Sequence, residues 1–172
     1  MAVETVEQAK TLITNWLKEN GHQVRLVPDD NATFHFEIDY PLGGMKRQRV
    51  IQPKEMPGLI VVLNGVAIAD EHKEKIKELS EDEKDKFYNM IRKYLMFAEN
   101  SYDIDSDENG VAKQVQFSYE FYLDGLTKTS LFKGLLLNHR TLMYFVTTFN
   151  EKFGIPELPD SKGDQQAPCG VQ

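Results

Sequence analysis

The fold is decided by the stretch Ala32-Thr33-Phe34-His35-Phe36-Glu37-Ile38-Asp39-Tyr40. From Phe34 onward its even-numbered positions are apolar or aromatic, and the positions between them are polar. Side chains alternate between the two faces of a strand, so this period of two predicts a strand with one buried and one solvated face. Strands of this kind belong to antiparallel sheets that are covered on one side.

The flanking sequence supplies the other elements. Apolar or alternating runs predict further strands at residues 22–27, 47–52, 59–69, 101–105 and 111–123, with a turn at 41–44. Apolar residues at spacings of three and four predict helices at 3–20, 70–79, 80–98 and 129–153. With the two middle helices counted as one region, the order is α-ββββ-α-ββ-α. Consecutive strands joined by short turns imply an α+β fold, with an antiparallel sheet packed against helices.

Two features of the central region, the strand at 59–69 and the helix after Ser80, need closer description. The pair Asn64-Gly65 is typical of a type I′ hairpin turn, which would split the strand at 59–69 in two. We prefer a single central strand with a bulge at that pair, because residues 66–69 lead straight into a helix start, which we expect Asp70 to cap. In the next helix, which Ser80 caps, we expect a buried stripe of Phe87, Met90, Ile91, Tyr94, Leu95 and Ala98.

Length and composition bound the class of protein. The chain has 172 residues, a formal charge of −7 and 10% aromatic residues. This suits a single α+β domain at 1–156 followed by a polar, disordered tail at 157–172. No apolar run is long enough for a membrane span, and the start lacks the pattern of a secretory signal. The single cysteine, Cys169, permits no internal disulfide, so we expect a cytoplasmic protein.

The acidic balance argues against a general nucleic-acid binder, which needs positive charge. A local exception is the group Lys46, Arg47, Arg49 and Lys54, which would suit an anion-binding strip. The simpler interpretation is that these residues face solvent and protect a strand from edge pairing. The four histidines, His22, His35, His72 and His139, show no metal-ligand spacing, and we expect them at the surface.

The segment from Asp103 to Gly110 has acidic residues at its first, third and fifth positions, as a calcium loop does. However, Glu108 stands where such a loop requires glycine, and Gln114 stands where it requires a bidentate glutamate. A hairpin that turns at Asn109-Gly110 explains the same residues without a metal. We therefore predict a hairpin and keep a calcium sensor as a separate hypothesis.

Catalytic motifs are missing from the sequence, which contains no nucleophile elbow and no phosphate-binding loop. We predict no catalytic, cofactor-binding or metal-binding residues from local spacing. An alternative remains in which the fold assembles a site for a small molecule, an anion or an enzymatic reaction. Adjacent strands would then bring together the polar residues His35, Glu37, Asp39, Arg47 and Arg49.

The segment Tyr119-Glu120-Phe121-Tyr122-Leu123 concentrates aromatic side chains on both faces of one strand. One face must pack on a helix, and the other either lies under a second layer or forms a contact surface. Tyr119, Phe121 and Tyr122 are therefore our candidate interaction residues.

Several motifs also resemble a known family. They are Phe34-His35-Phe36 with Tyr40-Pro41, Val50 to Lys54, Leu59 to Leu63, Glu71-His72-Lys73, and Tyr122 to Lys128. With the element order, they resemble an uncharacterised archaeal family that shares the α+β fold of type III secretion chaperones, over about residues 3–155. The resemblance implies a homodimer that holds an extended segment of another protein on apolar surface. It implies no activity, because the family has none assigned.

Taken together, the residues and the resemblance predict a non-enzymatic, intracellular interaction or chaperone-like module. The partners we expect are a second copy of the chain and an unidentified protein, with neither nucleic acid nor membrane among them.

Overall fold

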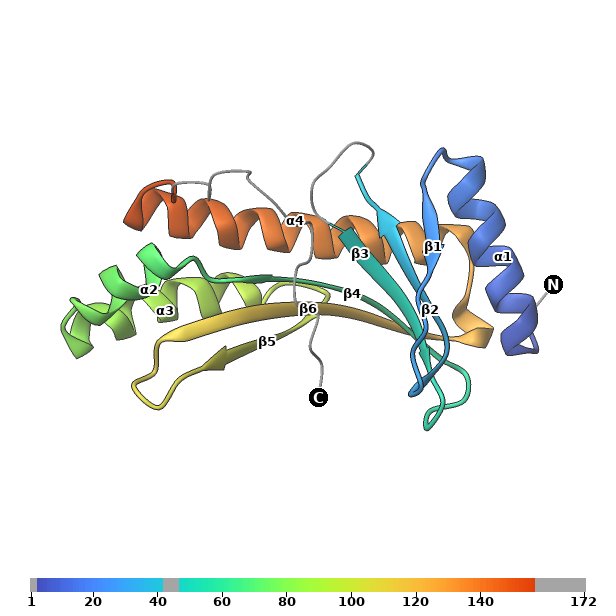
Figure 1. Ribbon diagram of the computed structural model, residues 1–172, viewed down its shortest axis with the longest axis horizontal. Coiled ribbons are helices and arrows are strands. Elements are labelled where there is room, and N and C mark those ends of the chain that lie inside the picture. Colours follow the sequence, from blue (N-terminus) through green and yellow to red (C-terminus); the bar gives the residue numbers. More distant parts are fainter. Residues whose placement is uncertain (1–2, 42–46, 157–172) are drawn as a thin grey trace.

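The computed structural model describes residues 3–41 and 47–156 (Figure 1). The predicted tail at 157–172 and most of the predicted turn at 41–44 lie outside these residues. The helices are α1 (Val6–Glu19), α2 (Asp70–Lys77), α3 (Glu81–Leu95) and α4 (Lys128–Phe153), with a 3-10 turn η1 (Leu123–Gly125). The strands are β1 (Val24–Leu26), β2 (Ala32–Asp39), β3 (Arg47–Pro53), β4 (Leu59–Ala67), β5 (Ser101–Ser106) and β6 (Ala112–Tyr122).

The strands form one sheet in the order β1-β2-β3-β4-β6-β5, and every neighbouring pair is antiparallel. The α-helices pack on one face of it, with α4 running along the sheet and α1 lying at the end near β1 (Figure 1). The predicted α+β class is confirmed. The predicted alternation in β2 is confirmed too, since Phe34, Phe36 and Ile38 are buried.

Among the described residues, the core consists of two clusters between the sheet and the helices. The first joins α1, strands β2 to β4 and the first half of α4. The second joins α2, α3, the first half of β6 and the second half of α4. Both α4 and β6 contribute buried side chains to each cluster, so these two long elements connect the ends of the molecule.

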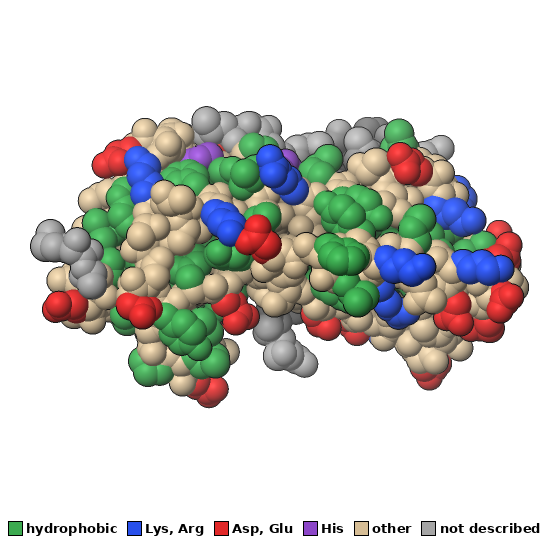
Figure 2. All heavy atoms as spheres, turned by 180° about the vertical axis from the view of Figure 1, so that it is seen from behind, with side chains coloured by type: hydrophobic (Ala, Val, Ile, Leu, Met, Phe, Trp, Pro, Cys, Tyr) green, Lys and Arg blue, Asp and Glu red, His purple; other side chains and the backbone are tan. Residues whose placement is uncertain are grey.

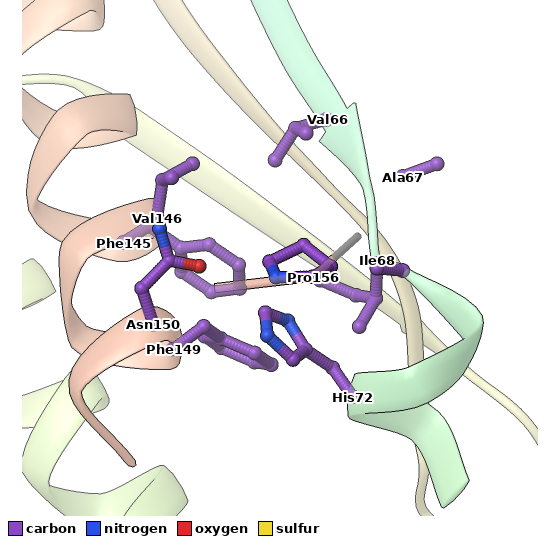
Figure 3. Close-up of a pocket in the computed structure, with 10 residues that line it drawn as sticks. Val66, Ala67, Ile68, His72, Phe145, Val146, Phe149, Asn150 and Pro156 are labelled. Atoms are coloured by element: carbon purple, nitrogen blue, oxygen red, sulfur yellow. The ribbon is translucent and has the colours of Figure 1, made fainter. Parts of the chain in front are cut away.

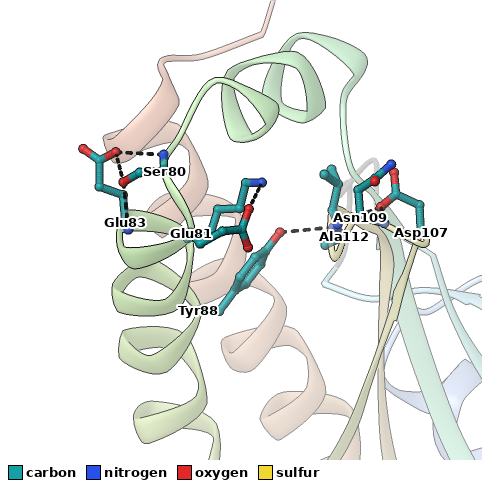
Figure 4. Close-up of polar contacts among 9 residues, drawn as sticks. Ser80, Glu81, Glu83, Tyr88, Asp107, Asn109 and Ala112 are labelled. Carbon is teal, nitrogen blue, oxygen red and sulfur yellow. Dashed lines mark hydrogen bonds and ion pairs between the residues drawn. The ribbon is translucent and has the colours of Figure 1, made fainter.

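Local chemistry explains where the helices begin. The helices α1, α3 and α4 each begin with a capping box, in which the capping hydroxyl and the side chain three residues later exchange hydrogen bonds with backbone groups. Figure 4 shows the box of Ser80 and Glu83. The expectation for α2 is wrong, because Ala69 occupies its capping position and Asp70 is the first helical residue. Asp70 still lies in the first turn, where negative charge is favourable.

The strand β4 is unbroken, as preferred, but the predicted bulge is wrong. Its pairing with β6 keeps one register from Leu59 to Ala67. Gly65 has a different role, since a Cβ there would lie 2.6 Å from the backbone oxygen of Val115. The glycine therefore permits close approach of β6, and Asn64 before it is buried on the helical side.

The expected stripe of α3 is partly wrong. Phe87, Ile91 and Leu95 are buried, whereas Met90 and Tyr94 are 48% and 42% exposed. The spacing of four between Phe87, Ile91 and Leu95 keeps them on one narrow face of the helix. Met90 and Tyr94 lie to the side of that face and remain accessible.

Candidate interaction surfaces

The aromatic strand β6 divides its side chains between two environments. Tyr119 and Phe121 point to the helical side, where a Cβ on Gly134 of α4 would lie 2.7 Å from the Tyr119 ring. Tyr122 points the opposite way and is 62% exposed. One face of the segment thus packs on a helix, as the sequence requires, and Tyr122 is the accessible member of the three candidate residues.

Tyr122 belongs to a larger face that no helix of the described residues covers. We call this side of the sheet the open face. Its centre carries Ile51 of β3 and Val61 of β4, which lie directly opposite each other, with Leu63 farther along β4. All three are half-buried.

The β1–β3 end of the open face is rich in arginine. Glu37 of β2 lies between Arg25 of β1 and Arg47 of β3, and it accepts hydrogen bonds from both guanidinium groups. Burial alone would raise the pKa of Glu37, but the Arg25 hydrogen bond and the charges of Arg25 and Arg47 outweigh it and hold the pKa below its usual value. Arg49 lies opposite Glu37 and next to Leu63.

The structure therefore brings most of the predicted polar group together. Asp39 turns aside, since it accepts a 2.7 Å hydrogen bond from the backbone N–H of Gln23. His35 pairs with Asp29, at 2.9 Å between Nδ1 and Oδ2, beside a hollow of about 230 Å³. The backbone N–H of Asn31, and then the bond from His35, lower the pKa of Asp29.

Two expectations about the basic residues and the histidines are wrong. The strand β3 is an interior strand between β2 and β4, so Arg47 and Arg49 do not protect an edge. His22 and His72 are buried rather than exposed, and His35 is largely covered. Each has a partner on one ring nitrogen; for example, His72 Nε2 lies 2.7 Å from the carbonyl oxygen of Gly154, whereas Nε2 of His35 is buried without a partner among the described residues.

The opposite end of the open face is acidic. Strand alternation places Asp103 and Asp105 of β5 there, together with Glu120 of β6. The predicted hairpin of β5 and β6 is confirmed. Asp107 accepts hydrogen bonds from the backbone N–H groups of Val111 and Asn109, which hold its pKa below the usual value and leave its carboxylate engaged with the turn (Figure 4).

Metal and ligand sites find little support. Among the residues that the structure describes, no three His, Cys, Asp or Glu side chains are grouped so that they could hold a metal ion. A cavity of about 90 Å³ lies between the end of β4, α2 and α4 (Figure 3). Its walls are mostly apolar, and His72 at its edge is already bound to Gly154. The cavity suits a small apolar group and has no sequence signature.

A second accessible surface lies on the helical side. Met90, Tyr94 and Phe97 follow each other at spacings of four and three along α3 and the turn after it, and all are exposed. The Tyr94 ring stacks on Tyr144 of α4, with centroids 3.5 Å apart. We call these four residues the helical patch. Figure 2, a view from behind, shows hydrophobic side chains gathered near the middle of the molecule, with basic and acidic side chains around them. The sequence missed the patch because Met90 and Tyr94 were assigned to the core.

An antiparallel sheet with helices on one face defines a two-layer α+β protein. No helix among the described residues is long and apolar enough to cross a membrane. Within this class, the chain belongs to the family described as "Uncharacterized conserved protein (DUF2299)", which matches residues 9–149.

A solved structure of the same shape is also similar to the chain. It is the crystal structure of an uncharacterized protein from Methanothermobacter thermautotrophicus, with a TM-score of 0.78 and 28% sequence identity. The match covers 85% of this chain and 99% of that one. No curated protein matches the chain. These comparisons establish the family and the fold, and they carry no activity.

Proposed function

We propose that this protein is a non-enzymatic interaction module of the cytoplasm that acts as a homodimer, with two copies meeting through their open faces. The observation that carries the proposal is the half-exposed apolar centre of the sheet, Ile51, Val61 and Leu63, together with exposed Tyr122. Apolar side chains on neighbouring strands of an uncovered sheet are typical of a contact surface. A second sheet packed on them would complete the burial.

The charges on the open face support a second copy as the occupant. Three arginines and two carboxylates lie on its β1–β3 end, whereas Asp103, Asp105 and Glu120 lie on its β5–β6 end. A two-fold axis parallel to β4 would place β3 of one copy over β6 of the other. The pairing registers would then place Arg49 over Ser118 of the partner, two residues along β6 from Glu120, twice in the dimer, while Val61 and Leu63 meet their equivalents near the axis.

The chaperone-like part of the proposal rests on the element order, which resembles the fold of type III secretion chaperones. A dimer that joins through one layer leaves its helical layer available to another protein. The alternative of a ligand-binding or catalytic polar group has weaker support. The carboxylate of Glu37 is already held by two arginines, and the Nε2 atom of His35 is shielded from solvent.

The test is the oligomeric state of the full chain, measured by sedimentation equilibrium across micromolar concentrations. We expect a dimer that Tyr122→Glu weakens by about tenfold or more, since it places a charge in an apolar contact. Arg49→Glu should weaken the dimer as well. The double variant Arg49→Glu with Glu120→Arg should recover affinity, because the exchanged charges are again opposite in sign and two residues apart across the interface.

Met90→Glu is the matched control, since it adds the same charge to an exposed residue on the helical side. It should leave the dimer unchanged. A monomer at all concentrations, or a dimer that Met90→Glu weakens and Tyr122→Glu does not, would contradict the proposal.

A further inference from the structure

We infer that the helical patch binds an amphipathic helix of a partner protein, one that carries acidic residues beside its apolar stripe. This inference deepens the proposed function, on which it rests, by naming the partner's chemistry and the surface it uses. Phe97 is the most exposed large apolar residue of the described chain, at 89%. Burying such a side chain is strongly favourable once a partner is present.

The charges around the patch select the partner. Between Asp85 and Glu99, and again between Asp124 and Glu151, the chain has no acidic residue, although its total charge is −7. Lys93 and Arg140 lie in these segments and are exposed. Arg140 precedes Tyr144 by one helical turn, so both lie on the same side of α4. An acidic partner is therefore favoured.

The same charges disfavour contact of this patch with its own copy. A two-fold contact would bring Lys93 and Arg140 toward their equivalents, which repel each other. The open face has the opposite arrangement, with complementary ends. The two surfaces thus have different occupants, and a dimer joined through the sheet would present two helical patches.

The shape of the patch indicates a helix. Met90, Tyr94 and Phe97 form a line about 10 Å long, given the rise of 1.5 Å per residue. Such a line matches the apolar stripe of one helix, which repeats at the same spacings. Methionine and aromatic side chains are common in surfaces that receive helices, because they adapt their shape to the apolar residues of the partner.

The experiment titrates the full chain into a fluorescent synthetic peptide and follows its anisotropy. The probe is an amphipathic helix of about 18 residues built from Leu, Ala and Glu, which is long enough to form a helix. Its counterpart has Lys in place of every Glu. We expect saturable binding of the acidic peptide and at least roughly tenfold weaker binding of the basic one.

Phe97→Asp should weaken binding of the acidic peptide by about tenfold, and its high exposure means that folding is unaffected. Lys93→Glu combined with Arg140→Glu should shift the preference toward the basic peptide. Met56→Asp is the matched control, because Met56 is 53% exposed and lies between β3 and β4. It should leave binding unchanged.

Equal binding of both peptides, or an equal loss with Met56→Asp, would overturn the inference. A third outcome would overturn the inference in favour of a lipid surface. In it, the wild-type chain binds vesicles of anionic phospholipid but neither peptide, and Phe97→Asp abolishes the vesicle binding. Tyr122→Glu separates the two proposals. If that variant is monomeric and still binds the peptide, the open face and the helical patch act independently. If the chain proves to be monomeric, the dimer proposal fails, and the effect of Phe97→Asp on peptide binding still tests the helical patch.

Discussion

The side-chain amide of Asn138 donates a 2.8 Å hydrogen bond to the backbone carbonyl of Val62, which fastens α4 to the central strand β4. The same side chain accepts a 2.9 Å bond from Asn100, and Asn100 in turn accepts a bond from Thr141. All of these side chains are buried. The network therefore helps to fix the position of α4 along the sheet, because a shift of the helix would break these buried bonds.

Asn138→Ala should lower the free energy of unfolding by about 2–4 kcal/mol, because it leaves buried polar partners without bonds. Urea denaturation monitored by circular dichroism measures the loss. Thr147→Ala, an exposed change on the same helix, should stay within about 0.5 kcal/mol of the wild type. Similar effects of the two variants would contradict the role of the network.

Gly134→Ala should be destabilising by about 1–3 kcal/mol, although alanine favours helices, because its Cβ would lie 2.7 Å from the Tyr119 ring. Thermal denaturation provides the measurement. Gly125→Ala, where no atom lies within 4 Å of the added Cβ, is the control and should be tolerated. Tyr119→Leu should relieve the clash, so the double variant should cost less than the sum of its parts.

Tyr88→Phe should reduce stability by about 1–2 kcal/mol. The Tyr88 hydroxyl accepts a 3.1 Å hydrogen bond from the buried backbone N–H of Ala112, at the start of β6 (Figure 4). In the variant, the backbone N–H of Ala112 has no hydrogen-bond partner. Hydrogen exchange should consequently accelerate at the Ala112 amide. Unchanged exchange there would show that the bond is not formed in solution.

Glu37→Gln should flatten the acid dependence of stability. The folded pKa of Glu37 is below the usual 4.5, so its ionised form favours the folded state above that value. This contribution is lost as the pH falls from about 5 through the folded pKa. Urea midpoints across this range should decline more steeply for the wild type than for the variant. Parallel declines would exclude a contribution from the arginine contacts.

Calcium should produce no saturable heat in a calorimetric titration. The carboxylate of Asp107 is occupied by the N–H groups of Asn109 and Val111, and strand alternation directs Asp103 and Asp105 onto the open face. Asp107→Ala should instead loosen the hairpin, which hydrogen exchange at Val111 would detect. A stoichiometric calcium isotherm would revive the sensor hypothesis.

The element order was predictable because it rests on local patterns. The period of two in β2 and the turn chemistry of the β5–β6 hairpin each encode their own structure. The bulge at Asn64-Gly65 was mispredicted because the glycine serves a contact with Val115, which is 50 positions away in the numbering of the chain. The cap of α2 was mispredicted because a carboxylate in the first turn resembles one at the capping position.

The surfaces were harder to predict. Periodicity identified two faces of β6, but it could not decide whether Tyr122 lay under another layer. The helical patch was hidden, because exposed Met90 and Tyr94 follow the same spacing as buried core residues. His72 contacts Gly154 at the end of α4, far along the chain, so its burial had no local signal, whereas Asp29, the partner of His35, lies only a few residues before it.

The length of α4 and β6 has a consequence for how the molecule responds to stress. Either core cluster alone is a small assembly, yet each contains part of both long elements. Local unfolding that begins at α1 or at α2 must therefore expose buried side chains of α4 or β6, while the other cluster still packs against the same element. The two ends therefore unfold together as one cooperative unit. A partner bound at the helical patch and a partner bound at the open face would both raise the free energy of unfolding of that unit.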